Sequence, residues 1–518
     1  WNNKGLALTR LNRLPEALSC FEKALAIEPD HAEAILNKGN TLSKLGKHTE
    51  AIKCFDTLLE KDPGNVTAWN NKANALARMG KADDAIAAYD RATKIAPNFE
   101  LAQVNKGNTL MSIERYEEAK RSFDKALELN PKNAHAWYSR GAILKKLKAP
   151  PDESLKALDA ALALDPTHAQ AWNTKGDLLL DNKKLDEAIS CYDTVIQLQP
   201  DNVEAWFHRG SALSAKTKYT DAIASLDKAT ELDPEYLDAW NAKGHAWHTV
   251  GEAEKAIFNF DKVTELEPRH IEAWDNKGVA YYTMGRTHDA IKCFEKCVNI
   301  DPKYEKGWYN MASAYSAEGK VNEALGCYEK AIEVRPDYGK AWNNMGNLLF
   351  SVDRYDDAMR CFDRALVLDG TYEKAWNNKG NILLSRGDTQ TALTCFNRAI
   401  ELDPNYEKAW NNKGSALFNL GQMEESLECF RKALQLKKDY DKAWYNAGAA
   451  LFKMGKPDEA IACFDKAIEL KPRYDEAWYN KGAALFKVGK VQEAIECFNE
   501  TLKLNPKHHE AWYNLGNA

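Results

Sequence analysis

An aromatic position that recurs at a fixed distance organises the apolar and polar residues of this chain. We call it the Trp column, and each copy lies 34 residues after the last, except that the step from Trp137 to Trp172 is 35 residues. Ile35 and Gln103 occupy two of its places. The other fourteen are Trp1, Trp69, Trp137, Trp172, Trp206, Trp240, Trp274, Trp308, Trp342, Trp376, Trp410, Trp444, Trp478 and Trp512.

Each repeat carries the apolar spacing of two amphipathic helices. Gly or Ala follows the Trp column by four residues and a large apolar residue follows it by seven, as at Gly414 and Leu417. That spacing places the Trp column and both followers on one face of a first helix, with Trp expected to be buried. After a short turn, a second helix places small and aromatic residues together at Ala460, Phe464 and Ala467.

Proline separates one repeat from the next. It closes 13 of the 15 complete repeats, and Gly370 and Lys438 replace it in the other two. Because proline cannot continue a helix, it marks the turn into the following repeat. The longer repeat carries its extra residue in the segment 145–154, where Pro150 and Pro151 suit the start of a second helix.

Neither predicted helix can bury its apolar stripe alone, so consecutive helix pairs must stack into a continuous core. We therefore predict an all-α chain in which residues 1–518 form a single continuous array. It has 15 complete repeats, one of 35 residues at 137–171, and the start of a sixteenth, with no separate catalytic domain. Because the chain opens at Trp1 and both ends interrupt a repeat, we expect flanking repeats or domains outside it.

The repeat resembles the tetratricopeptide repeat family, whose signature has Trp, Gly, aromatic, Ala, aromatic, Ala and Pro columns at these offsets. All seven columns recur together along the whole chain. The resemblance implies a right-handed superhelical α-solenoid in which the first helix of every repeat lines the concave side. It also implies a role in binding other proteins.

Composition and charge narrow the classes of partner. A formal net charge of −6 gives no general attraction to nucleic acid or to anionic lipid. No stretch approaches the roughly 18 to 20 uninterrupted apolar residues of a membrane-spanning helix. We therefore predict a protein or peptide partner, and neither nucleic acid nor membrane.

Ten of the eleven cysteines share one column of the second helix, immediately before its aromatic residue. Equivalent positions in neighbouring repeats should lie roughly 8 to 10 Å apart, too far for a disulfide. We interpret them as small buried packing residues. Unpaired cysteines in this number favour a cytoplasmic setting, although the sequence does not determine the compartment.

Asparagine dominates the position two residues after the Trp column, which we call the ladder column. It occurs in 12 of 16 copies, and Asn is a mediocre helix former, so helix propensity does not account for it. An amide can donate and accept, so it can bond the backbone of an extended peptide whatever its side chains are. The predicted peptide-binding residues of this column are Asn37, Asn71, Asn105, Asn276, Asn310, Asn344, Asn378, Asn412, Asn446 and Asn480.

The ladder column resembles the asparagine ladder in the tetratricopeptide arm of O-linked N-acetylglucosamine transferase, which implies that these amides grip a partner's backbone. The alternative is that each Asn is solvated or bonds its neighbour in the next repeat. The column is interrupted by Ser139, Thr174, His208 and Ala242, so we expect the middle of the groove to bind differently.

Lysine dominates a second column, two residues before Trp, in the later repeats. This lysine column consists of Lys306, Lys340, Lys374, Lys408 and Lys442. Acidic residues occupy the same position on either side, at Glu204, Asp238, Glu272, Glu476 and Glu510. A basic patch between acidic ones would select an acidic segment, whereas ordinary surface charge is the alternative.

Lys with Asn on successive helices also resembles the carboxylate clamp of chaperone-binding members of the family. That pattern needs a second Asn, five residues after Trp, which Asn347 and Asn381 supply. The clamp is therefore expected only around Lys374 and Lys408.

No catalytic or cofactor motif is visible in the sequence. There is no Gly-rich phosphate loop, no nucleophile with a base at recognisable spacing and no Cys/His zinc pattern, so we predict no enzyme activity and no cofactor. His208, His245 and His248 share one predicted face. A transition-metal site is one interpretation of them, and solvent-exposed histidines are the other; we predict no bound metal.

The favoured function is a scaffold that binds an extended peptide or partner protein along the concave groove through Asn amides and the lysine column. One alternative is the substrate-recruiting arm of an enzyme whose catalytic part lies outside this chain. Another is an architectural array whose uncapped ends self-associate end to end.

Overall fold

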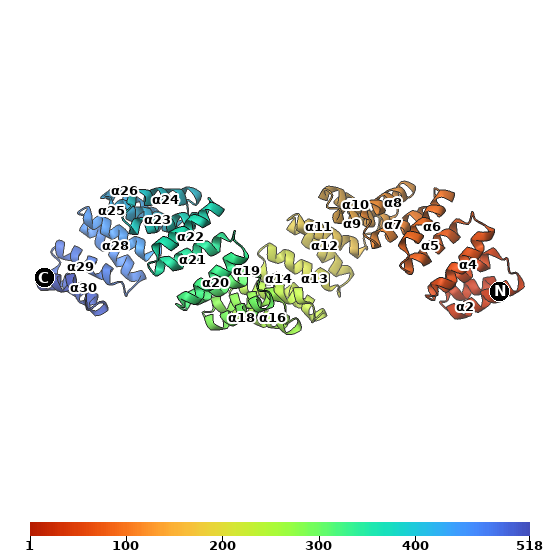
Figure 1. Cartoon of the computed structure of the whole chain (residues 1–518), viewed down its shortest axis with the longest axis horizontal. Helices are drawn as coiled ribbons and strands as arrows, with labels where there is room; N and C mark the ends of the chain where they lie inside the picture. The colour runs from red at the N-terminus through yellow and green to blue at the C-terminus, as the bar shows by residue number, and fades with distance from the viewer. The chain divides into compact units, whose positions relative to one another are not determined.

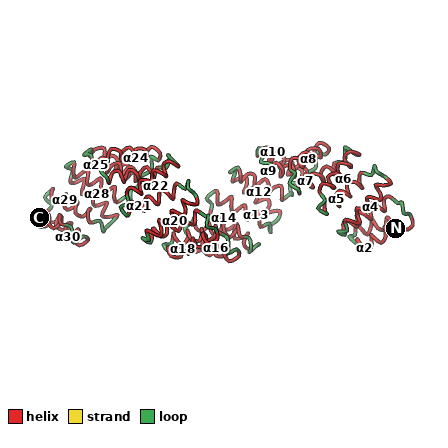
Figure 2. Tube along the Cα trace, viewed as in Figure 1, coloured by secondary structure: helices red, strands yellow, loops and turns green.

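The computed structural model describes residues 1–518 and contains 31 α-helices and no strands. Figure 2 shows helices joined by short loops along the whole trace. The prediction of an all-α fold is confirmed. None of the helices combines the length and the apolar character that crossing a membrane requires.

The chain divides into two compact units, residues 1–262 and 263–518, and the boundary falls inside α16 (Ala253–Leu266). The helices of the first unit are α1 (Asn2–Arg10), α2 (Leu14–Ile27), α3 (Ala32–Lys44), α4 (His48–Lys61), α5 (Val66–Arg78), α6 (Ala82–Ile95), α7 (Glu100–Ser112), α8 (Tyr116–Leu129), α9 (Ala134–Lys146), α10 (Pro151–Leu164), α11 (Ala169–Asp181), α12 (Leu185–Leu198), α13 (Val203–Ala215), α14 (Tyr219–Leu232) and α15 (Leu237–Thr249). Those of the second unit are α17 (Ile271–Thr283), α18 (Thr287–Ile300), α19 (Glu305–Ala317), α20 (Val321–Val334), α21 (Gly339–Ser351), α22 (Tyr355–Leu368), α23 (Glu373–Ser385), α24 (Thr389–Leu402), α25 (Glu407–Asn419), α26 (Met423–Leu436), α27 (Asp441–Lys453), α28 (Pro457–Leu470), α29 (Asp475–Lys487), α30 (Val491–Leu504) and α31 (His509–Asn517).

Within each unit the helices form antiparallel pairs that stack in chain order, as Figure 1 shows. We number the repeats by these pairs, from repeat 1 (α1 and α2) to repeat 15 (α29 and α30), with α31 following. The first helices of successive repeats also touch one another, as α21, α23 and α25 do. Each unit is therefore an α-solenoid, with one surface lined by the first helices.

A glycine of the first helix lets the aromatic residue of the second helix come close. A Cβ atom added at Gly380 would lie 2.6 Å from Cε1 of Phe396. Phe396 itself is fully buried, in a core cluster with Ala392 of its own helix and Ala416 of the next repeat. This aromatic-on-glycine contact recurs along the chain and fixes the separation of the two helices in a repeat.

The Trp column differs from the prediction, because its twelve Trp side chains from Trp69 to Trp478 are half-buried rather than buried, whereas Ile35 and Gln103 are buried and Trp1 and Trp512 are exposed. The indole N–H of Trp410 donates to the carbonyl oxygen of Pro404 at 3.0 Å, and the other Trp residues of the column after Trp1 make the same bond to the residue six positions earlier. In two repeats the acceptors are Gly370 and Lys438. The bond uses a backbone carbonyl, which explains why these residues can replace proline.

The remaining local predictions concern a turn and the cysteines. The longer repeat does carry its extra residue between the two helices, because α9 ends at Lys146 and α10 begins at Pro151. All eleven cysteines are free, and nine are buried while Cys54 and Cys463 are partly exposed. Burial raises the pKa of the Cys361 thiol to about 11, as expected for a packing residue.

Candidate functional site

The ladder column lies on the first helices, half-buried at the surface they line, and its amides connect neighbouring repeats. Nδ2 of Asn378 donates to Oδ1 of Asn343 at 3.0 Å. Asn310, Asn344, Asn412, Asn446, Asn480 and Asn514 donate in the same way to the residue that lies 35 positions earlier. The structure thus shows the inter-repeat bond that the alternative interpretation expects. Its role toward a peptide stays a prediction.

In repeats 10 to 14 these bonds join into one unbroken relay. The acceptors, one residue after Trp, form what we call the acceptor column. Seven hydrogen bonds of 2.8 to 3.4 Å run in order from Asn446 through Asn411, Asn412, Asn377, Asn378, Asn343 and Asn344 to the hydroxyl of Tyr309. Each ladder amide from Asn344 to Asn412 donates one of its two N–H groups within the relay and keeps the other.

The five residues of the lysine column are exposed, and none of them forms an ion pair or a hydrogen bond within the chain. The helix α23, which carries Lys374, also carries a lysine outside the column, and that lysine is paired. Lys379, five residues after Lys374 on α23, pairs with Asp363 at 2.7 Å. Lysines on this helix are therefore paired where they serve the fold and unpaired in the lysine column.

A groove of about 1010 Å³ in the second unit brings the two columns together. It contains four members of the lysine column, but not Lys306, and three members of the ladder column. Asn347 and Asn381, the second asparagines that a carboxylate clamp needs, line the same groove. Its other polar lining residues are Tyr309, Asn343, Tyr372, Asn377, Tyr406, Glu407, Asn411, Lys437, Tyr440 and Asp441. Five lysines against two carboxylates make the groove basic.

Sequence reasoning missed the tyrosines of this groove. Tyr372, Tyr406 and Tyr440 lie four residues before Trp, each at the N-cap of a first helix, and the three are partly exposed. Burial raises the pKa of the Tyr372 and Tyr440 phenols to about 12, and that of Tyr406 in the same direction. The phenols therefore stay protonated at neutral pH. Their regular recurrence was the signal that could have found them.

A second, smaller groove of about 660 Å³ lies in the first unit and holds Asn37, Asn71 and Asn105 of the ladder column. Asn40, Asn74 and Asn108, which follow Trp-column positions by five residues, line it as well and were missed. A short relay runs from Asn105 through Asn70 and Asn71 to Asn40. Its basic residues are Lys44 and Arg78, at a different offset from the lysine column.

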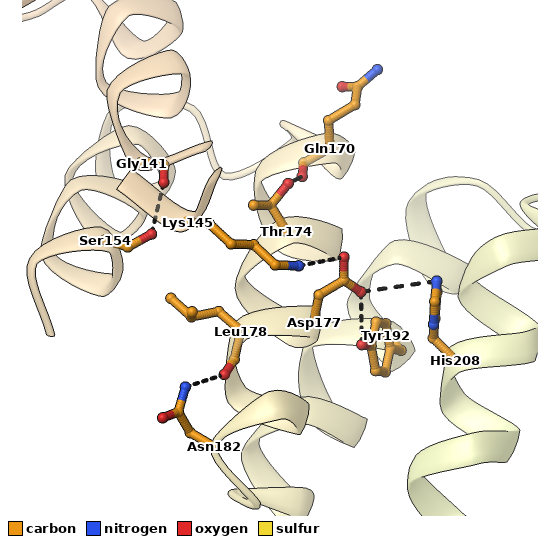
Figure 3. Close-up of polar contacts among 10 residues, drawn as sticks. All are labelled: Gly141, Lys145, Ser154, Gln170, Thr174, Asp177, Leu178, Asn182, Tyr192 and His208. Atoms are coloured by element: carbon orange, nitrogen blue, oxygen red, sulfur yellow. Dashed lines mark hydrogen bonds and ion pairs between the residues drawn. The ribbon is translucent and has the colours of Figure 1, made fainter. Parts of the chain in front are cut away.

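Where the ladder column is interrupted, a charged cluster joins three repeats, as Figure 3 shows. Oδ2 of Asp177 on α11 accepts from Lys145 Nζ of α9 at 3.0 Å, and Oδ1 accepts from the Tyr192 hydroxyl of α12 at 2.9 Å. Nε2 of His208 on α13 lies 3.9 Å from the same Oδ1, and its ring stacks on Tyr192 at 5.6 Å. Thr174, in the ladder column, turns back to the carbonyl of Gln170.

The histidines do not assemble a metal centre. No group of three or more His, Cys, Asp or Glu side chains in residues 1–518 could hold a metal ion. His208 faces Asp177, while His245 contacts the ring of Phe260 edge-on at 6.0 Å. His248 lies partly buried on α15, the helix that carries His245.

A buried carboxylate occupies the acceptor column at Asp275 on α17, which is 8% exposed. Its oxygens accept from Asn310 Nδ2 at 2.8 Å and from the Tyr304 hydroxyl at 3.0 Å. Burial raises the pKa of Asp275, although these two hydrogen bonds oppose the shift. The relay position can thus be filled by an amide, a phenol or a carboxyl.

Family models described as tetratricopeptide repeat match along nearly the whole chain. One model matches residues 1–31, 305–338, 339–372, 373–406, 441–474 and 475–508, and a second matches 36–98, 150–203, 173–235 and 207–263. Three further models of this repeat match 107–148 and 414–455, then 271–304, then 395–428. No curated protein matches the chain.

Several solved structures are similar to this chain. One is the APC/C hetero-tetramer Cut9–Hcn1, at 16% identity and a TM-score of 0.43, covering 88% of this chain and 96% of that one. Another is Naa15/Naa10 bound to HypK-THB, at 14% identity and 0.35, covering 99% and 94%. YrrB, described as a TPR protein with an unusual peptide-binding site, is 26% identical with a TM-score of 0.31, covering 36% and 96%.

Proposed function

Because this chain belongs to the tetratricopeptide repeat family, whose members serve as protein–protein interaction scaffolds, we propose that it binds an extended acidic segment of a partner protein. The proposed site is the groove of the second unit that holds Lys340, Lys374, Lys408 and Lys442. The proposal gives the chain no catalytic step and needs no cofactor.

The observation that carries this proposal is the unpaired state of the lysine column. Four exposed ammonium groups line one groove without an ion-pair partner in the chain. In contrast, Lys379, which lies on α23 with Lys374, pairs with Asp363. Like charges gathered in a groove repel one another and attract a partner of opposite sign. An acidic segment would relieve that repulsion while the lysine side chains stay close to water.

The ladder column supports the proposal because the relay leaves some of its hydrogen-bond donors and acceptors unused. Asn344, Asn378 and Asn412 each keep one N–H group and one carbonyl lone pair, which match the C=O and N–H of a peptide backbone. The relay itself fixes each amide in one orientation. A partner would therefore meet donors and acceptors that need no reordering on binding.

The test is titration of the full chain with a Glu-rich peptide by isothermal calorimetry. The triple variant Lys340→Ala, Lys374→Ala and Lys408→Ala should bind about 100-fold more weakly, at roughly 1 kcal/mol per exposed charge pair. Wild-type affinity should also fall as salt is raised.

The matched control removes charge from the same helices outside the groove. Lys379→Ala and Lys413→Ala lie on α23 and α25, where their ammonium groups sit over Trp376 and Trp410, and neither lines the groove. This double variant should bind the peptide as the wild type does. Equal losses in the two variants, or indifference to salt, would overturn the proposal.

A further inference from the structure

Three tyrosines of the groove, Tyr372, Tyr406 and Tyr440, occupy a capping position without capping it, and of the three only Tyr440 packs against a core cluster, with Lys437 over its ring at 5.8 Å. The position four before Trp is the N-cap of the first helix, and in other repeats Asn65 or His31 caps it by accepting from a backbone N–H. Tyr372, Tyr406 and Tyr440 make no such bond. A lost N-cap costs about 1 kcal/mol, so the tyrosine must be explained by something else.

Neighbouring tyrosines in the same column are explained by packing. Tyr338 and Tyr474 are buried, because Tyr309 and Tyr445 of the preceding repeats lie over them with ring centroids 5.2 and 5.1 Å away. Tyr304 donates to Asp275. Each of these three has a partner within the chain.

The acceptor column decides which tyrosines stay uncovered. In repeats 11 to 13 it holds Asn343, Asn377 and Asn411 in place of Tyr, so no ring covers the tyrosine of the following repeat. Those following tyrosines are Tyr372, Tyr406 and Tyr440, and their hydroxyls form no hydrogen bond within the chain. The tyrosine rings are therefore uncovered in the groove wherever both the acceptor column and the ladder column hold asparagine.

The spacing of these side chains selects one backbone conformation for a ligand. Lys and Tyr recur once per repeat, and packed helices lie about 8 to 10 Å apart. An extended β-strand brings side chains back to one face every two residues, about 6.6 Å, which is too short. A polyproline II helix does so every three residues at 3.1 Å each, about 9.3 Å, which matches.

Resting on the proposed function, we infer that the bound segment is a polyproline II helix with an acidic side chain at every third residue. The acidic side chains pair with Lys340, Lys374, Lys408 and Lys442 in turn. The intervening residues, proline or small apolar ones, lie against the tyrosine rings, and the phenols donate to backbone carbonyls of the segment. Aromatic-lined grooves are a general means of binding this preformed helix at low entropic cost.

The experiment uses the full chain and peptides of equal length and composition, made of Glu, Pro and Ala. Glu stands at every third residue in one peptide, at every second residue in another, and in one block in the last. The every-third peptide should bind about tenfold tighter than the other two, because it alone pairs all its carboxylates in register. Affinity is read by fluorescence anisotropy of a labelled peptide.

The outcomes separate this inference from the proposed function. Equal binding of all peptides, or tightest binding of the every-second peptide, overturns the polyproline II register and leaves an acidic ligand in place. Absence of binding by every peptide overturns both.

A variant tests the tyrosines by covering one of them with a ring, as the chain already does in two other repeats. Asn377→Tyr would place a ring over Tyr406, as Tyr309 lies over Tyr338 and Tyr445 over Tyr474. The new hydroxyl can accept the relay bond, because the hydroxyls of Tyr309 and Tyr445 already accept it from Asn344 and Asn480. The every-third peptide should bind about fivefold more weakly, since one stacking surface is lost. Unchanged affinity in a variant with an unchanged thermal midpoint would overturn the role of the tyrosines.

Discussion

The groove of the second unit and the charged cluster of the first both join neighbouring repeats through side chains of the first helices, yet they treat charge in opposite ways. In the groove, neutral amides such as Asn378 and Asn343 join the repeats and the lysine column stays unpaired. In the cluster, Asp177 joins three repeats and takes Lys145 as its partner. In these two regions the lysines are unpaired where neutral amides join the repeats, and Lys145 is paired where a carboxylate joins them.

The comparison assumes that both regions share the same close contact between a glycine of the first helix and an aromatic residue of the second. Overpacking that contact should give the largest loss of stability. Gly380→Ala and Gly176→Ala would each place a Cβ within 2.6 to 2.7 Å of an aromatic ring, Phe396 or Tyr192. Overpacking of this kind should cost about 2 kcal/mol at either site, measured by chemical denaturation. Gly326→Ala on α20, where a Cβ meets nothing within 4 Å, should instead stabilise the chain slightly. A large loss at only one of the two sites would contradict a common scaffold.

The next effect compares the two ways of joining repeats. Asp177→Ala removes an ion pair and a phenol bond and leaves Lys145 and Tyr192 without their acceptor, so it should cost about 2 kcal/mol. Asn378→Ala removes neutral bonds only and should cost about 1 kcal/mol. Hydrogen exchange at the flanking helices would localise each loss. If the amide variant proved the more costly, the relay and not the charged cluster would be the stronger joint.

The smallest effect concerns Asp275, where a carboxyl sits in the relay position that amides fill in repeats 11 to 13. Burial raises its pKa in the folded chain, so its stabilising contribution is full below about pH 4, the unfolded value, and is lost as pH rises through the raised value. Asp275→Asn should therefore match the wild type at low pH and be more stable at pH 7. Thermal midpoints across this range measure the difference.

Asp369 provides the control of opposite sign for that pH series. The Thr371 hydroxyl lowers the pKa of this exposed carboxyl, so Asp369 stabilises the fold above its unfolded value and loses that contribution as pH falls. Asp369→Asn should consequently be less stable than the wild type at pH 7. Parallel behaviour of the two variants would mean that burial does not set the titration of Asp275.

The repeat fold was predictable because each element is encoded within one repeat. The spacing of Gly414, Leu417 and the aromatic of the second helix defines the helix pair without reference to any distant residue. The burial of Trp was predicted wrongly, because the spacing of apolar residues treats Trp as wholly apolar and takes no account of its indole N–H. That N–H needs an acceptor, which the proline carbonyl supplies at the surface.

The site was predictable only as single columns. The ladder and lysine columns stand out because one residue type recurs, whereas the opening of Tyr406 depends on the identity of Asn377 in the repeat before it. The same holds for the relay, in which an amide of one repeat bonds a residue 35 positions away. Such relations join two columns across two repeats, and no single column reveals them. The lysine and asparagine columns stay predictions as binding residues until a ligand is tested.

The relay of repeats 10 to 14 also has a direction. Every bond between repeats passes from a later amide to an earlier one, from Asn446 at one end to Tyr309 at the other, so the amide dipoles add along the floor of the groove. A chain lying on an oriented row of dipoles does not have the same energy when it is turned end for end. The floor therefore discriminates between the two polarities of a bound backbone, and a sequence and its retro-sequence are different ligands for it.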